Sequence, residues 1–150
     1  MKKIIVSTST TFILVFFIIK TMATADIVNI PKGQTCMITK VIDGDTMHAV
    51  CNDRKTKIRM TIIDSYEKSR NNRAYKQAYI QKMTIDEVVQ RGKKASAITK
   101  HILEGQTIKF VPDTTQLKDR YNRDLGLIYF NNEEINSKLL TEHPDVFLKY

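Results

Sequence analysis

Three short runs of the sequence carry side chains that together could cleave a phosphodiester. Residues 41–46 read VIDGDT, residues 58–67 read IRMTIIDSYE and residues 119–123 read DRYNR. They supply carboxylates that could hold a hard cation, a further carboxylate for proton transfer, and arginines for a phosphate. This is the minimum set for metal-assisted attack of water, so the sequence indicates hydrolysis of DNA or RNA.

The elements that must position these runs are mostly strands. From β-branched content and turn signals, strands are predicted at about 34–42, 45–52, 55–64, 106–111 and 125–130. A helix is predicted at about 84–104, starting at a capping box and stopped by Gly105, and a short one at about 134–142. The fold class is therefore α+β and β-rich: a five-stranded OB-type β-barrel with a helix between strands 3 and 4 and a short C-terminal helix.

Two positions constrain this scaffold further. Arg59 and Asp64 have opposite parity, so a flat strand would aim them at opposite faces. We therefore expect the third strand to coil, bulge or end before Asp64. Gly92 lies inside the long helix at some cost to stability, which suggests that the helix crosses a strand closely there.

In this order, and with these elements between them, the three runs resemble the thermonuclease family, also called micrococcal or staphylococcal-type nucleases. The resemblance covers roughly residue 34 to the C-terminus. One run alone would be weak evidence, whereas all three in order are specific. The resemblance implies a Ca²⁺-dependent, sugar-nonspecific nuclease that cleaves the 5′ P–O bond of DNA and RNA and leaves 3′-phosphate ends.

The resemblance also implies a Ca²⁺ site made by the carboxylates of Asp45 and Asp64 and the backbone carbonyl of Ser65. Such oxygen ligands, completed by waters, suit a hard cation. Taken singly, Asp45 is as well explained as a turn residue and Asp64 as a strand terminator. Asp43 is explained by turn chemistry and is not a proposed ligand.

The remaining site residues are assigned in the same way. Glu67 matches the family's general base, although the sequence leaves open whether it takes a proton or mainly orients water. Arg59 and Arg123 match two phosphate-binding arginines, whose planar forks suit phosphate oxygens. Arg120 and Tyr121 match positions that contact the terminal phosphate and the base. Each arginine alone could be an ordinary surface residue.

The first 25 residues are predicted to be a signal peptide. A basic start, an apolar run at residues 12–19 and an A-x-A site at residues 23–25 are typical of one. The alternative is a membrane anchor, but a span needs about 20 apolar residues. We therefore expect a protein that is secreted or periplasmic.

Residues 26–150 then form one nuclease domain. Its 21 basic and 16 acidic residues leave a net charge of +5, since three lysines and no acid belong to residues 1–25. A basic surface favours a polyanion such as DNA or RNA. We expect a monomer without stable membrane association once the signal is removed.

Two cysteines in an exported chain suggest one disulfide. If Asp43-Gly44 is a two-residue hairpin turn, Ile42 faces Asp45 and the same register places Cys36 opposite Cys51. The alternative is two unpaired thiols.

Residues 68–83 are polar and basic, with Tyr75 and Tyr79 interleaved among lysines and arginines. Cations and rings in this spacing suit single-stranded nucleic acid. A solvated, partly helical insert is the alternative, and the stretch is longer than the matching loop of the best-known family members.

The chain departs from the family pattern at several places. Tyr66 replaces a common proline, Asn122 replaces a glycine, and Asp124 could pair with Arg123 and compete with phosphate. The best-known members also continue past the position of Tyr150 with a further helix, so a smaller core is expected. A short active form and an inactive relic are both compatible with this; retention of every proposed catalytic and metal residue favours activity.

A secreted OB-fold module that binds single strands without cutting is the rival interpretation. It would need the barrel and the basic surface but not the five chemical side chains Asp45, Asp64, Glu67, Arg59 and Arg123.

Overall fold

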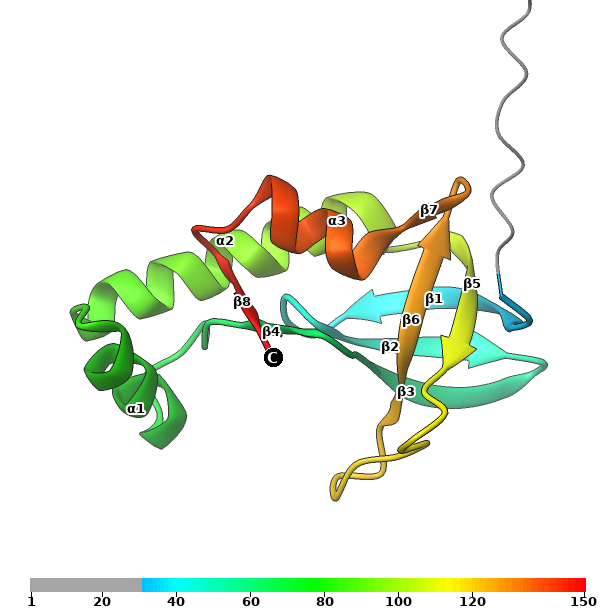
Figure 1. Cartoon of the computed structure of the whole chain (residues 1–150), viewed down its shortest axis with the longest axis horizontal. Helices are drawn as coiled ribbons and strands as arrows, with labels where there is room; N and C mark the ends of the chain where they lie inside the picture. The colour runs from blue at the N-terminus through cyan, green and yellow to red at the C-terminus, as the bar shows by residue number, and fades with distance from the viewer. Residues whose placement is uncertain (1–30) are drawn as a thin grey trace, which may run out of the picture.

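Five strands of alternating burial close into a barrel in the computed structural model, which describes residues 31–150. The strands are β1 (Gln34–Val41), β2 (Thr46–Cys51), β3 (Arg54–Met60), β5 (Thr107–Pro112) and β6 (Asp124–Phe130). Their order is β3-β2-β1-β5-β6, and a parallel pairing of β3 with β6 closes the barrel (Figure 1). The OB-type fold expected from the sequence is confirmed. The proposed signal peptide, residues 1–25, lies outside the described residues.

Three helices and three short strands complete the structure. The helices are α1 (Asn72–Gln81), α2 (Ile85–Leu103) and α3 (Ile135–Glu142); the short strands are β4 (Ile63–Ser65), β7 (Glu133–Glu134) and β8 (Phe147–Lys149). The helix predicted at 84–104 is confirmed, including the capping box between Thr84 and Glu87. The stretch at 68–83 is partly helical, because α1 lies there, and its contact with single-stranded nucleic acid stays a prediction. No helix of residues 31–150 is long and apolar enough to cross a membrane.

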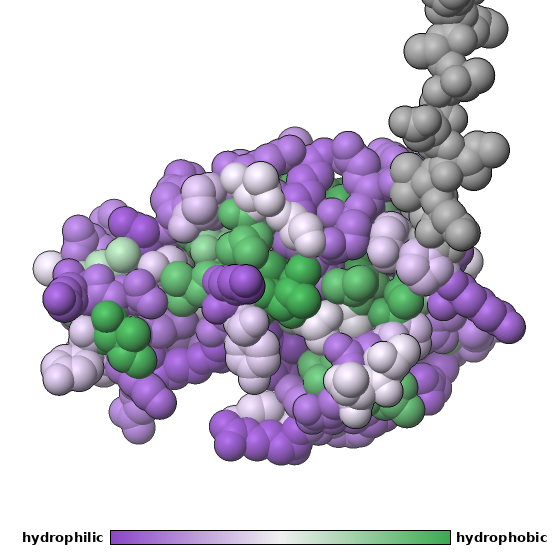
Figure 2. All heavy atoms as spheres, viewed as in Figure 1, coloured by the Kyte–Doolittle hydropathy of each residue, from purple (hydrophilic) through white to green (hydrophobic). Residues whose placement is uncertain are grey.

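The core has a large and a small part. The barrel interior and the faces of α2 and α3 against it are filled mainly by aliphatic and aromatic side chains, including Ile38, Met47, Ile58, Phe110 and Leu139. A smaller cluster of Tyr66, Ala74, Ala78 and Val88 joins α1 to α2. Apolar side chains gather in the middle of the face drawn in Figure 2, and polar ones surround them. The small cluster matters here because it holds α1 beside the candidate site.

The β1–β2 hairpin differs from the two-residue turn expected at Asp43-Gly44. Val41 pairs with Met47, and the backbone N–H groups of Ile42 and Asp43 both donate to the Thr46 carbonyl (2.9 and 3.2 Å). A tight type I′ turn needs positive φ at both central residues, and neither Asp43 nor Gly44 has it. The expected turn is therefore wrong.

The disulfide between Cys36 and Cys51 is nevertheless confirmed. These residues pair directly across β1 and β2 because a register shift between Ile38 and Lys40 compensates for the wider turn. Closing a segment of 15-residue separation contributes about 3 kcal/mol in the chain-entropy model.

The third strand ends early, as the parity of Arg59 and Asp64 required. β3 stops at Met60, Ile62 adopts a φ of 62°, and β4 resumes at Ile63. A left-handed β-branched residue is strained, so the surroundings must hold it. The N–H of Tyr150 donates to the Ile62 carbonyl (2.9 Å), and β8 pairs with β4. The break allows Arg59 and Asp64 to meet.

Candidate active site

The buried guanidinium of Arg59 joins two of the three runs. Its Nη1 lies 2.5 Å from Oδ2 of Asp45, and its Nη2 donates to Oδ1 of Asp64 at 2.9 Å. The arginine side chain is only 7% exposed. Asp45 precedes β2, Arg59 lies near the end of β3 and Asp64 lies in β4, so three elements place their side chains around one charge.

Asp45 is fixed by further hydrogen bonds. Its Oδ2 accepts the Ser65 N–H (2.8 Å), and its Oδ1 accepts the Thr46 hydroxyl (2.9 Å). Burial raises the pKa of the Asp45 carboxyl above its usual range, although Arg59 opposes this by favouring the ionised form. The sequence-predicted ligands Asp45, Asp64 and Ser65 are therefore brought together.

Glu67 is placed by close contact with α2. A side chain on Gly92 would come within 2.4 Å of the Glu67 backbone carbon, so only glycine lets the helix pack here. The expected close crossing at Gly92 is correct, but the partner is the segment after β4 rather than a strand. Gln77 of α1 clamps the same segment, accepting the Glu67 N–H (2.9 Å) and donating to the Ser65 carbonyl (3.0 Å).

Arg73 of α1 is a site residue that the sequence analysis did not single out. Its Nη2 lies 2.5 and 2.7 Å from the two carboxylate oxygens of Asp64, and its Nη1 lies 3.2 Å from Oε1 of Glu67. The Asn71 amide donates to the other Glu67 oxygen (2.8 Å) while its own oxygen caps α1. The sequence does carry a signal for α1, because Asn71 is a good N-cap and Ala74 and Ala78 follow at helical spacing. It carries no signal for the direction in which the Arg73 side chain points.

Arg123 belongs to the third run and approaches the same place from the other side. Its Nη1 donates to the Thr46 hydroxyl (3.0 Å), which in turn binds Asp45. Its Nε donates to Asp119 (2.6 Å). Burial would raise the pKa of Asp119, but hydrogen bonds from the backbone and side chain of Arg123 outweigh it and hold that pKa below its usual range.

Arg120 and Tyr121 lie beside Arg123. The guanidinium carbon of Arg120 is 4.8 Å from the centre of the Tyr121 ring, and that of Arg123 is 5.4 Å from it. The ring itself is exposed. A base could therefore stack near both arginines.

The departures from the family pattern have local explanations. The sequence suggested that Asp124 competes with phosphate for Arg123, but its carboxylate instead binds Lys118 and the Thr56 hydroxyl. Asn122 takes a φ of 60°, which asparagine tolerates. Tyr66 is buried in the small cluster, with Arg91 over its ring.

The donors around Arg59 and Arg73 suit a hard cation by their chemistry. Asp45, Asp64, Glu67 and the Ser65 carbonyl offer only oxygen atoms, and the two guanidinium groups already bind the carboxylates as cations. Within residues 31–150, no three His, Cys, Asp or Glu side chains form a metal-binding group by themselves. A bound ion would therefore need the carbonyl and waters as well.

The sequence profile described as "Staphylococcal nuclease homologue" matches residues 57–143, which is more than half of the chain. The chain belongs to the staphylococcal nuclease family. This family assignment confirms the resemblance seen in the three runs, the second and third of which lie wholly inside the matched range.

Individual relatives agree with the family. The thermonuclease of Staphylococcus hyicus is 33% identical over 109 residues, covering 73% of this chain and 56% of that protein. The thermonuclease of Staphylococcus intermedius is 29% identical, covering 74% and 58%. An uncharacterized endonuclease of Haemophilus influenzae is 25% identical, covering 74% and 51%. This staphylococcal-nuclease homologue thus spans about half the length of the curated relatives it matches.

Proposed function

We propose that the protein is an exported, Ca²⁺-dependent, sugar-nonspecific nuclease that cleaves DNA and RNA and leaves 3′-phosphate ends. The observation that carries the proposal is the convergence around Arg59. Carboxylates from two separate runs bind its guanidinium, and Arg123 from the third run is hydrogen-bonded to the same cluster through Thr46. Relatives named thermonuclease and endonuclease support the same activity.

Asp45, Asp64 and the Ser65 carbonyl would hold Ca²⁺, which when bound supplies Lewis-acid stabilisation of the charge that develops on the phosphate. Arg123 and Arg59 are the groups that meet phosphate oxygens. Arg123 is well placed for this because Asp119 and Thr46 fix its orientation while leaving it partly exposed. Arg120 and Tyr121 would position the neighbouring phosphate and base.

Glu67 is the proposed general base. Asn71 and Arg73 hold its two oxygens, and the packing of Gly92 holds its backbone. A carboxylate fixed in this way can orient a water and accept its proton as the water attacks phosphorus in line. The rival, a binding module without catalysis, gains nothing from burying the charges of Asp45 and Arg59, which costs desolvation energy.

Metal dependence is the direct test of this function. We expect purified protein lacking residues 1–25 to cleave DNA and RNA in millimolar-range Ca²⁺, because a site with few carboxylates and several waters is weak and open. Mg²⁺ should serve poorly, since it demands tighter octahedral geometry. Gel assays with Ca²⁺, Mg²⁺ or excess chelator measure this. Full activity in chelator would contradict the metal-assisted scheme, and binding without cleavage in Ca²⁺ would favour the rival.

Arg73 should compete with Ca²⁺, because it binds both oxygens of Asp64 and one oxygen of Glu67. We expect Arg73→Gln to tighten Ca²⁺ binding by about two- to fivefold, the range of a half-exposed ion pair. Calorimetric titration with Ca²⁺ alone measures the effect without reference to activity.

The matched control is Arg70→Gln, which removes the same charge from the same region. Arg70 pairs with Asp86, away from the proposed ligands, and is mostly exposed. Its Ca²⁺ affinity should stay close to that of the parent. If both substitutions changed the Ca²⁺ affinity equally, Arg73 would act only through its net charge and not through its contacts with Asp64 and Glu67.

A further inference from the structure

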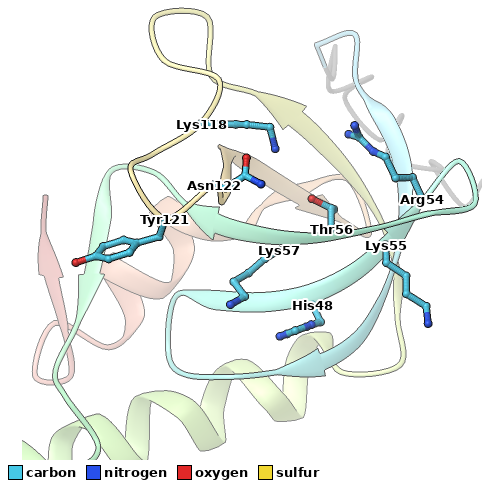
Figure 3. A pocket seen from close by; sticks show the side chains of 8 residues that line it. All are labelled: His48, Arg54, Lys55, Thr56, Lys57, Lys118, Tyr121 and Asn122. Atoms are coloured by element: carbon cyan, nitrogen blue, oxygen red, sulfur yellow. The ribbon is translucent and has the colours of Figure 1, made fainter.

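A basic groove of about 450 Å³ lies next to the candidate active site, on the outside of the barrel. We call it the β3 groove. Its walls are His48, Arg54, Lys55, Thr56, Lys57, Lys118, Tyr121 and Asn122. Figure 3 shows Lys118, Asn122 and Tyr121 on one side and the β2–β3 residues on the other.

The groove exists because β3 is only partly paired. β3 pairs with β2 along its length, but its pairing with β6 is confined to Ile58–Met60. The first half of β3 therefore has a free edge, and the loop before β6 lies across from it. Lys118 and the carboxylate of Asp124 close the far end of this loop.

The charge of the groove is strongly unbalanced. Arg54, Lys55, Lys57 and Lys118 contribute four cations, and the Asp124 carboxylate pairs with two of them, Arg54 and Lys118. Asp124 binds Lys118 and lies 3.8 Å from Arg54. In the part of the chain that the structure describes, neither Lys55 nor Lys57 has an ion-pair partner, and both are exposed. Two uncompensated lysines two residues apart on one strand attract a polyanion.

The groove is continuous with the proposed phosphate site. Tyr121 lines it, and the same ring lies against Arg123. On the opposite wall, His48 stands two residues after Thr46, whose hydroxyl accepts a hydrogen bond from Arg123. A strand bound at Arg123 can therefore run on along β3 without leaving basic surface.

We infer that the β3 groove binds the phosphodiester backbone of a single nucleic-acid strand beyond the linkage that is cut. This inference rests on the proposed nuclease function and assigns it an extended substrate site. Lys55 and Lys57 would contact phosphates without sequence preference, and Tyr121 would offer a ring for an unpaired base. The pairing of Asp124 with Lys118 and Thr56 keeps that carboxylate from facing the strand freely.

The test compares Lys55→Gln/Lys57→Gln with Lys93→Gln/Lys100→Gln. Both double variants lose two positive charges, and Lys93 and Lys100 are exposed on α2, outside the groove. Fluorescence anisotropy in excess chelator measures the binding of a thymidine dinucleotide and of a longer single-stranded oligonucleotide, so that cleavage does not interfere. Circular dichroism and thermal unfolding confirm that each variant is folded.

The groove variant should bind the longer strand more weakly than the parent, with dinucleotide affinity unchanged. Each lost phosphate contact lowers the slope of log K against log salt by about 0.7 for single strands, so the slope should fall by roughly 1.4. Between 50 and 200 mM salt, the parent should lose about sevenfold more affinity for the longer strand than the variant, as that slope difference requires. The α2 variant should keep the parent's slope.

Cleavage of a thymidine phosphodiester too short to reach the groove separates this inference from the proposed function. Equal Ca²⁺-dependent cleavage by the parent and the groove variant, with a reduced slope in the variant, supports both. If the parent cleaves but the slope is unchanged, the groove assignment is overturned and the nuclease stands. If the parent cuts no substrate but the slope still falls, the groove stands and the nuclease does not.

Discussion

Replacing Glu67 with glutamine should lower the turnover rate of DNA cleavage by roughly 10²–10⁴-fold, the range for a positioned acid–base group. The amide is nearly isosteric but cannot take a proton from water. Its oxygen can still accept a hydrogen bond from Asn71 or Arg73, and the backbone stays clamped by Gln77. The loss should therefore be chemical rather than structural.

Binding measurements distinguish this loss from a failure to hold substrate. Affinity for a single strand in chelator should be retained or rise slightly, because one negative charge near the phosphate is removed. Glu142→Gln is the control, since Glu142 is exposed on α3 and its carboxylate lies 3.9 Å from Lys138, away from the proposed site. If Glu67→Gln cut DNA as fast as the parent, the nuclease activity would stand, but Glu67 would not be its general base.

Replacing Arg59 with alanine should lower the free energy of unfolding by about 3–5 kcal/mol, the usual effect of removing one partner from a buried charge pair. The substitution leaves Asp45, 5% exposed, without its ion-pair partner and removes one of the two arginines on Asp64. Two carboxylates would then repel each other, one of them buried and the other partly buried. Urea unfolding in chelator measures the loss.

Ca²⁺ should restore part of the stability of Arg59→Ala, because a cation at the carboxylates replaces the missing charge. Arg54→Ala is the control: the same residue type on the same strand, but 67% exposed and 3.8 Å from Asp124, so its loss should be below about 1 kcal/mol. Arg59→Lys keeps one charge and should fall between parent and alanine variant. Similar stability for Arg59→Ala and Arg54→Ala would show that the bridge to Asp45 and Asp64 contributes little.

Local sequence signals predicted the five barrel strands, α2 and α3, but not α1 or the short strands. The capping box at Thr84 and Glu87 defined the start of α2, and the β-branched runs defined the five barrel strands, because these signals act within a few residues. The parity conflict between Arg59 and Asp64 even predicted the break in the third strand. The prediction could not say that Ile62 would carry it, since a positive φ at isoleucine depends on contacts with the C-terminal strand.

The Cys36–Cys51 pair shows a correct prediction that rested on an incorrect turn. The sequence implied the pairing through a two-residue loop, whereas the structure reaches it through a wider loop and a register shift near Lys40. The extra residue in the turn and the register shift in the strand offset each other, so Cys36 still lies opposite Cys51. The sequence cannot distinguish this loop from a two-residue turn, but the two loops point the Asp45 side chain in different directions.

The sequence by itself determined the barrel, the disulfide and the set of side chains proposed to do chemistry. Only the tertiary structure decided which charges meet: Arg73 lies on Asp64 and Glu67, and Asp124 binds Lys118 instead of Arg123. The first depends on how the small apolar cluster packs α1 against α2. The second depends on the bridge between Lys118 and Asp124, which places these two residues side by side. The sequence specifies residue types and their periodicity. The direction in which a long charged side chain points is set by contacts between elements that lie far apart in the sequence.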